Sequence, residues 1–244
     1  MSKPVLLVAG GSRGIGAAIA KMAGARGYDV AVNYAKNEKA AQDVVSAIKA
    51  SGGQAVAIQG DMGKEADIER VFKAAEKLGP LTDFVHSSGI TGKASRLDAV
   101  SAQTVRGVLD VNTFGAIWCL RAAIQRMSTK NGGKGGSVVM ISSMAATIGG
   151  TNEYTWYAAA KAAVNTLVVG VAREVAKEGV RINGISPGLI DTEIHEAGRL
   201  ERVTPFVPMG RAGQADEVAE ATLFLLSDAA SYVTGAVLNV SGAR

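Results

Sequence analysis

The sequence predicts an α/β fold in which a doubly wound parallel sheet of about seven strands is covered by helices on both faces. Short apolar runs alternate with longer segments of helical periodicity along the 244 residues. The short runs are continuously apolar, as expected of parallel strands that are buried on both sides. Glycine-containing turns separate these segments, and neither a repeat nor a Pro/Ser-rich linker interrupts them. We therefore predict one domain spanning residues 1–244.

The predicted strands and helices follow one another in alternation. The first strand, 5–9, reads VLLVA and ends in glycines, and the helix after it closes at Gly27. Further strands are expected at 30–32, 55–58, 84–85, 137–141, 180–185 and 236–240. Helices are expected at 15–26, 38–50, 64–78, 102–127, 154–177 and 217–226. Sheets of this kind bind ligands beyond the carboxyl ends of their strands, so functional residues should follow the strands directly.

Composition excludes several classes of protein. Lys and Arg exceed Asp and Glu only by 26 to 22 and are scattered, which argues against a nucleic-acid surface. The single cysteine, Cys119, excludes an intrachain disulfide and lies in an apolar helical run, where a buried and inert thiol is expected. The apolar run near the start is too short for a signal peptide, and no stretch approaches membrane-spanning length. We expect a cytoplasmic protein without a membrane partner and without a metal.

A glycine loop occupies the first strand–helix connection, where residues 10–16 read GGSRGIG. Glycines permit positive φ and let the backbone approach a pyrophosphate, which the N-terminus of the next helix also attracts. The spacing is G-x-x-x-G-x-G and differs from the general dinucleotide fingerprint. At this position in an alternating α/β chain, the loop predicts a dinucleotide cofactor.

The end of the second strand bears on which dinucleotide is bound. An acid about 20 residues after the glycines holds the ribose 2′-hydroxyl of NAD, but Asn33, Tyr34 and Lys36 stand here instead. Arg13 in the glycine loop and Lys36 offer cations for a 2′-phosphate. The alternative is that both are ordinary solvated cations. The missing acid favours NADP(H), with NAD(H) still possible.

Tyr157 and Lys161 are spaced to share one face of a helix. An ammonium beside a phenol lowers the phenol pKa from its usual value of about 10, giving a proton donor and acceptor for carbonyl reduction. The same spacing also arises by chance in many helices. Tyr154 is a rival phenol, but position 158 is an alanine, so no lysine follows it at this spacing.

Taken in order, these motifs resemble the short-chain dehydrogenase/reductase family over essentially the whole chain. The resemblance implies a single-domain Rossmann-type fold, usually assembled as a homotetramer and sometimes as a dimer. It identifies Asn112, Ser143, Tyr157 and Lys161 with the family's catalytic set, and Asp61 with the acid that contacts adenine. The segment from Ser186 to Gly188 resembles the loop that seats the nicotinamide carboxamide. The implied cofactor-binding residues are Gly10, Ser12, Arg13, Gly14, Ile15, Gly16, Asn33, Tyr34, Lys36, Asp61, Met62, Ser88, Gly89, Tyr157, Lys161, Pro187, Gly188, Ile190 and Thr192.

Three positions depart from the family pattern. Ala9 stands where the family usually has threonine. His86 begins a His-Ser-Ser-Gly segment that replaces Asn-Asn-Ala-Gly, and it either offers a hydrogen bond or fills the adenosine side of the cleft. Ser143 lies one residue further from the tyrosine than is commonest, which predicts a bulge in 149–153 at the substrate mouth. Ser142 is the alternative catalytic serine.

The resemblance implies an NADP(H)-dependent oxidoreductase that moves a hydride between nicotinamide and a carbonyl or alcohol substrate. Ser143 would hydrogen-bond the substrate oxygen and Tyr157 would act as the general acid and base. Lys161 would lower the phenol pKa and hold the ribose, while Asn112 would kink its helix and fix a water. The alternative is a cofactor-binding regulatory protein of the same fold with little or no turnover.

The substrate is expected beneath a mobile lid at 189–211. Its predicted lining is mostly apolar, which favours a small or medium neutral carbonyl: Ile190, Ile194, His195, Phe206 and Met209 on the lid, and Met144, Thr147, Tyr154 and Trp156 opposite. His195 is expected to be an exposed lid residue. The pattern is closest to 3-oxoacyl-carrier-protein reductases and sugar dehydrogenases. Arg126, Lys130 and Arg173 are candidates for docking an acidic carrier protein.

Overall fold

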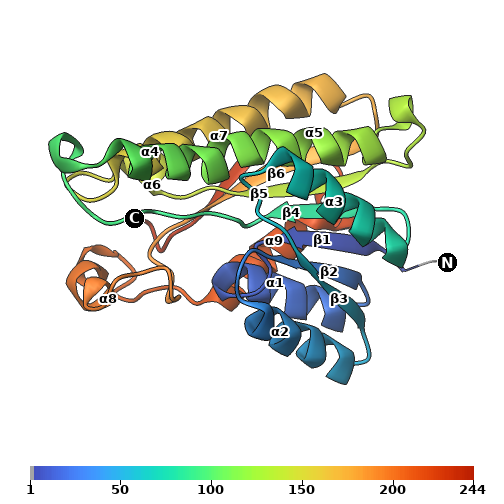
Figure 1. Cartoon of the computed structure of the whole chain (residues 1–244), viewed down its shortest axis with the longest axis horizontal. Helices are drawn as coiled ribbons and strands as arrows, with labels where there is room; N and C mark the ends of the chain where they lie inside the picture. The colour runs from blue at the N-terminus through green and yellow to red at the C-terminus, as the bar shows by residue number, and fades with distance from the viewer. Residues whose placement is uncertain (1–2) are drawn as a thin grey trace.

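A seven-stranded parallel sheet forms the centre of the computed structural model, which describes residues 3–244 (Figure 1). The strand order is β3-β2-β1-β4-β5-β6-β7, so the connection from β3 to β4 crosses β2 and β1 and reverses the direction in which strands are added. The strands are β1 (Val5–Ala9), β2 (Asp29–Tyr34), β3 (Gln54–Gln59), β4 (Asp83–His86), β5 (Gly136–Ile141), β6 (Val180–Pro187) and β7 (Val237–Val240). The predicted doubly wound sheet is confirmed. Each predicted strand is present: β1 matches its predicted bounds, β2 to β6 extend one or two residues further at one or both ends, and β7 begins one residue later.

The helices cover both faces of the sheet. They are α1 (Gly14–Ala25), α2 (Glu38–Ala50), α3 (Glu65–Ala75), α4 (Ala102–Leu109), α5 (Gly115–Met127), α6 (Ala145–Ile148), α7 (Thr155–Val175), α8 (Arg199–Val203) and α9 (Ala215–Leu226). Figure 1 shows α1 and α2 on one side and α4, α5 and α7 on the other. The short helices α6 and α8 lie at one end of the molecule with the C-terminal end of the chain. Neither was predicted.

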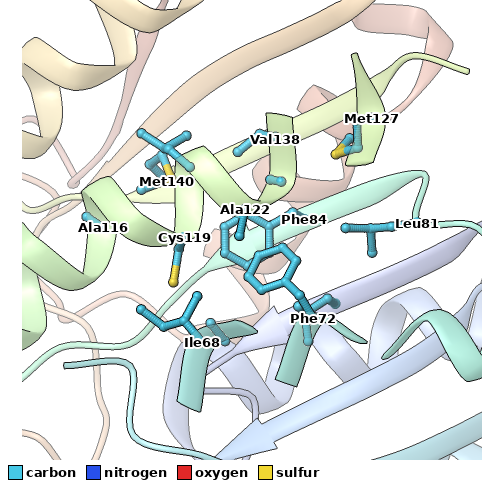
Figure 2. Packing of buried hydrophobic residues seen from close by; sticks show 14 of the residues in the cluster. Ile68, Phe72, Leu81, Phe84, Ala116, Cys119, Ala122, Met127, Val138 and Met140 are labelled. Carbon is cyan, nitrogen blue, oxygen red and sulfur yellow. The ribbon is translucent and has the colours of Figure 1, made fainter. Parts of the chain in front are cut away.

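Two apolar clusters hold the layers together. One joins the sheet to α3, α5 and α7, and its centre is the contact of Phe72 on α3 with Phe84 on β4, whose ring centroids are 5.0 Å apart (Figure 2). Cys119 lies in the same cluster, fully buried, with its pKa raised by burial, as predicted for an inert thiol. The other cluster joins the sheet to α1, α2 and α9. Burying a side chain the size of leucine contributes about 1.5–3 kcal/mol, so these clusters dominate stability.

The predicted helix 102–127 is present but interrupted. A π-helical segment at Asp110–Phe114 separates α4 from α5, at the place where a kink around Asn112 was expected. The expectation that no stretch reaches membrane-spanning length was wrong, because 102–127 is long and apolar enough by length and composition. The apolar residues on its inner face pack into the sheet cluster, where Ala116, Cys119 and Met127 are inaccessible to solvent.

The pH dependence of stability should carry a contribution from Asp83, at the amino end of β4. Burial raises its pKa to about 7, although a hydrogen bond from Thr82 opposes the shift. Between the unfolded and folded pKa values the folded state binds the extra proton, so stability falls as pH rises from about 4 through about 7. Asp83→Asn should remove this loss, and each pKa unit corresponds to about 1.4 kcal/mol.

Urea unfolding at pH 5 and pH 8 measures the effect. The variant should gain stability over the unmodified protein at pH 8 and gain much less at pH 5. Asp43→Asn is the matched control, because that exposed carboxylate lies on α2 and pairs with Lys39 on the same helix. An equal change at both pH values would contradict a protonation effect at Asp83.

Candidate active site

A cavity of about 730 Å³ opens at the carboxyl ends of the strands. Its wall is built from segments that follow β1, β2, β3, β4, β5 and β6, which is where parallel sheets place ligand sites. Every residue predicted to bind the cofactor lines it, and so do Ser143, Tyr157 and Lys161. The exception among the predicted site residues is Asn112, which is fully buried behind the wall.

The glycine loop fits an anionic group. Gly10 and Gly14 have φ angles of +72° and +50°, and a Cβ on Gly16 would lie 2.2 Å from the carbonyl oxygen of Gly10. No side chain caps the start of α1 and no acid stands in its first turn. The free N–H groups at this helix end therefore face the cavity with the partial positive charge that attracts a pyrophosphate.

Asn33 joins the glycine loop to the neighbouring strand ends. Its Oδ1 accepts a hydrogen bond from the Gly10 backbone N–H at 3.1 Å. Its Nδ2 donates to the carbonyl oxygens of Ile58 and Gly60 at 3.2 and 3.0 Å. The side chain is 1% exposed. Although Asn33 borders the cavity, these bonds occupy its amide, so it positions the loop and leaves no amide group free for a ligand.

The glycine loop and the segment after β2 each present a cation to the cavity. Arg13 and Lys36 are exposed, and both line the wall beside Tyr34. Within residues 3–244 neither forms an ion pair, since the salt bridges of that part of the chain involve other cations. Asp61 lies at the same end of the cavity and accepts a hydrogen bond from the Gly63 N–H at 3.0 Å. This end can hold an adenosine and a phosphate on its ribose.

Tyr157 and Lys161 both line the cavity from α7, with the Lys161 ammonium over the Tyr157 ring. The Lys161 Nζ lies 5.8 Å from the centre of the Tyr157 ring and donates to the Ile141 carbonyl oxygen at 2.8 Å. Burial raises the pKa of Tyr157, opposed by a hydrogen bond with Ser143 and by the charge of Arg199. The predicted lowering by Lys161 is therefore wrong for this state, in which burial dominates. Burial also lowers the pKa of Lys161 to about 8.

The two adjacent serines point in different directions. Ser143 lines the cavity, and its hydroxyl accepts from the Ala145 N–H at 3.1 Å and lies within hydrogen-bonding reach of the Tyr157 phenol. The hydroxyl of Ser142 is buried and donates to the Lys161 carbonyl oxygen at 3.1 Å. Ser142 therefore supports α7, and the geometry favours Ser143 for contact with a substrate.

Asn112 stands behind the cavity wall in the π-helical segment. Its Oδ1 accepts from the Ile90 N–H and its Nδ2 donates to the Ile90 carbonyl oxygen, both at 2.9 Å. A Cβ on Gly89 would lie 3.3 Å from the Lys161 Nζ and 3.5 Å from the Asn112 Oδ1. Asn112, Gly89 and Lys161 therefore meet closely at one point of the wall.

His86 does not line the cavity, which corrects its expected place in the cleft. It is fully buried at the end of β4, edge-on to Phe84 with ring centroids 6.4 Å apart. Neither ring nitrogen has a hydrogen-bond partner among residues 3–244. Burial, and then the charge of Lys161, lower its pKa to about 3, so the ring is neutral at physiological pH.

The substrate end of the cavity differs from the predicted apolar lining. Ile190, Ile194 and His195 line it from the lid, and Met144 and Tyr154 line it from the other side. Four predicted lining residues lie elsewhere: Phe206 and Met209 are exposed, Thr147 is exposed on α6, and Trp156 is buried with its Nε1 donating to the Thr91 carbonyl oxygen. His195 is half-buried, with Nε2 2.9 Å from the Ile190 carbonyl oxygen, so its expected exposure was wrong.

Charged residues that were not predicted complete this end. Glu153, Arg199 and Arg244 line the cavity. Glu153 belongs to the expected bulge, where Gly149, Gly150 and Asn152 all have positive φ. Its carboxylate pairs with Arg199 and, at 2.6 Å, with Arg202. Arg199 and Arg244 lie far from each other and from the catalytic motifs in the sequence, and no local pattern identifies them.

The structure also bears on Arg126, a candidate for docking a carrier protein, and on metal binding. Arg126 is not free to dock a carrier protein, because it is only 17% exposed and pairs with Glu69 and Glu76. Its guanidinium also lies over the Phe72 ring. In the part of the chain that the structure describes, no group of three or more His, Cys, Asp or Glu side chains is placed to hold a metal ion.

Known proteins match the sequence over nearly the whole length of the chain. A family model described as enoyl-(acyl carrier protein) reductase matches residues 9–242. The oxidoreductase YgfF of Escherichia coli, itself described as uncharacterized, is 43% identical over 98% of this chain and 99% of its own. An L-rhamnose 1-dehydrogenase (NAD(P)(+)) of Sphingomonas is 38% identical over 97% of this chain and 94% of its own.

Solved structures show the same architecture. A dehydrogenase/reductase from Sinorhizobium meliloti superposes with a TM-score of 0.93 at 31% identity, covering 100% of this chain and 95% of its own. A short-chain dehydrogenase from Burkholderia cenocepacia, solved in complex with NADP, superposes with a TM-score of 0.92 at 32% identity. That alignment covers 98% of this chain and 96% of the other.

Proposed function

Because the chain belongs to the short-chain dehydrogenase/reductase family, a family of oxidoreductases, we propose that it transfers a hydride between NADP(H) and a carbonyl or alcohol substrate, with Tyr157 as the general acid and base. The observation that carries this proposal is the convergence of Ser143, Tyr157 and Lys161 on the cavity that also contains the glycine loop. The loop holds the cofactor diphosphate, and the three side chains act at the other end of the same cavity.

Each residue of the catalytic set has a part in the proposed reaction. The nicotinamide, when bound, supplies or accepts the hydride. Ser143 donates a hydrogen bond to the substrate oxygen, where negative charge grows as hydride arrives. Tyr157 delivers the proton to that oxygen in the reductive direction and removes it in the oxidative one. Since the Tyr157 pKa is raised by burial, the phenol holds its proton at neutral pH and is ready to act as an acid.

Lys161 and Asn112 supply a cofactor contact and a proton path in this proposal. With a pKa of about 8, the Lys161 amine is mostly protonated at neutral pH and close to the point of releasing its proton. Asn112 fixes the Ile90 backbone and, with it, the segment that includes Gly89 beside the amine. We assign Lys161 to holding the nicotinamide ribose hydroxyls and Asn112 to positioning a water for proton supply.

Turnover tests the proposal directly. Purified protein should oxidise NADPH in the presence of some member of a panel of acyl thioesters, sugars and simple ketones, or reduce NADP⁺ with the matching alcohols. A protein that binds NADPH but turns over no member would favour the alternative, a cofactor-binding regulator. The presence of all four catalytic-set residues in one site favours the enzyme.

Cofactor preference should depend on Arg13 and Lys36. Replacing both by serine removes the two cations beside the ribose 2′ position, so the affinity for NADPH should fall by about 10–100-fold, as expected for loss of charge-assisted hydrogen bonds of about 1.5–3 kcal/mol. The affinity for NADH should change much less. Fluorescence titration of both nucleotides measures this. A parallel loss of NADH affinity would assign the two cations to the diphosphate instead.

We further propose that the protein acts in the cytoplasm as a homotetramer, with a dimer as the alternative. Support comes from large apolar side chains left exposed on α5, α7, α9 and β7: Ile117 on α5, Val169 on α7, Phe224 on α9 and Leu238 on β7. The free, buried Cys119 suits a reducing compartment. Light scattering of the purified protein gives the particle mass, and a monomer would contradict the assembly.

A further inference from the structure

Two guanidinium groups reach the substrate end of the cavity from segments distant in sequence. Arg199 begins α8 in the lid, and its side chain is 16% exposed. Its guanidinium lies 5.4 Å from the centre of the Tyr154 ring and contacts the Glu153 carboxylate. Arg244 approaches from the segment after β7 and lines the same cavity. The reacting centre and these two cations therefore share one compartment.

The guanidinium groups at this end of the cavity outnumber the carboxylates that pair with them. The single Glu153 carboxylate is divided between Arg199 and Arg202. Within residues 3–244 Arg244 forms no ion pair, while burial and the charge of Arg199 lower its pKa. Of the other lid acids, Glu193 lines the same cavity but lies toward Gly14 in the glycine loop, and Glu196 accepts a long contact from the Ala94 N–H. Two neighbouring guanidinium groups repel each other unless an anion joins them.

Arg199 and Arg244 share the cavity with the side chains proposed to carry out the reaction. The charge of Arg199 reaches the Tyr157 phenol and lowers its pKa against the effect of burial. Ser143 and Tyr157 are the side chains proposed to meet the substrate oxygen, and Arg199 lines the same cavity from α8 in the lid. Guanidinium groups bind carboxylates through paired N–H donors, which gives orientation as well as attraction. A carbonyl compound with a carboxylate would match both ends of this compartment.

We propose that Arg244 and Arg199 form a carboxylate-binding site, and that the substrate is a small oxo acid, or the hydroxy acid derived from it, whose carboxylate is held there while its oxygen meets Ser143 and Tyr157. This inference rests on the proposed function and names its substrate class. It replaces the neutral substrate expected from the apolar residues of the lid. Arg244 and Arg199 are the specificity-determining residues of the site.

Matched pairs of substrates test the proposal. The probes are acetoacetate and levulinate with their methyl esters, and dihydroxyacetone phosphate with dihydroxyacetone. The ratio of kcat/KM for acid over ester should exceed about tenfold, which corresponds to about 1.4 kcal/mol of selectivity. Arg244→Gln should bring this ratio close to one, chiefly by raising KM for the acid. Preference for the phosphate pair would identify a phosphate site in place of a carboxylate site.

A binding measurement separates this proposal from the proposed function. Calorimetric titration of the NADPH-loaded protein with acetoacetate should show binding that weakens at least tenfold in Arg244→Gln. Arg173→Gln is the control, since that cation lies on α7 and does not line the cavity. Turnover of esters and neutral ketones without preference for acids would overturn the carboxylate site and leave the oxidoreductase intact. Absence of acetoacetate binding would overturn it as well.

Discussion

Replacing Tyr157 by phenylalanine should lower kcat by about 10²–10⁴-fold, the usual contribution of a positioned general acid. The change removes only the hydroxyl, so the ring still fills its place on α7 and the cavity keeps its shape. The affinity for NADPH should stay within a few-fold of the unmodified protein. Steady-state kinetics with any substrate found in the panel, together with fluorescence titration of NADPH, measure the two quantities separately.

Tyr154 supplies the comparison that this experiment needs. Its phenol also borders the cavity, but burial raises its pKa and Arg199 covers its ring face. Tyr154→Phe should therefore affect KM more than kcat. If Tyr157→Phe kept its rate while Tyr154→Phe lost it, the proton donor would have been assigned to the wrong phenol.

Replacing Gly16 by alanine should weaken NADPH binding about 10–100-fold and lower stability by about 1–3 kcal/mol, the usual cost of overpacking. The added Cβ would lie 2.2 Å from the Gly10 carbonyl oxygen and 2.9 Å from its carbonyl carbon. Because both contacts are with backbone, no side chain can turn aside to relieve them. Relief requires the loop to move away from α1, which displaces the N–H groups that face the diphosphate. NADPH titration and urea unfolding measure the two effects.

Gly170 provides the matched control for this substitution. It lies within α7, and a Cβ there would meet nothing within 4 Å. Gly170→Ala should be neutral or stabilising, because alanine favours the helix over glycine by about 1 kcal/mol. Normal NADPH affinity in Gly16→Ala would mean that the diphosphate does not depend on the closeness of the loop to α1.

The sheet and most helix boundaries were predictable from the sequence, because parallel strands buried on both faces leave uninterrupted apolar runs such as Val5–Ala9. The site was predictable for the same reason, since its motifs follow those strands directly. The short helices α6 and α8 were not predictable. They are four and five residues long, too short for an apolar period to show.

The direction and partners of individual side chains were a second feature that the sequence did not predict. The spacing of Tyr157 and Lys161 correctly predicted a shared helix face, but the Lys161 amine bonds to the Ile141 carbonyl oxygen and leaves burial to set the phenol pKa. Arg126 looked like a free surface cation, yet its partners Glu69 and Glu76 come from a segment some 50 residues earlier in the chain. Such pairings depend on tertiary contacts that no local pattern encodes.

The amide of Asn33 has a consequence for changing cofactor preference by design. One side chain ties the glycine loop at Gly10 to the turn at Gly60, and both segments line the cavity proposed to bind the nucleotide. On that proposal, the two segments that contact the nucleotide are fixed to each other by the Asn33 amide. Redesign that aims to exchange one dinucleotide for the other can vary exposed positions such as Lys36 independently, whereas altering Asn33 would disturb both segments at once.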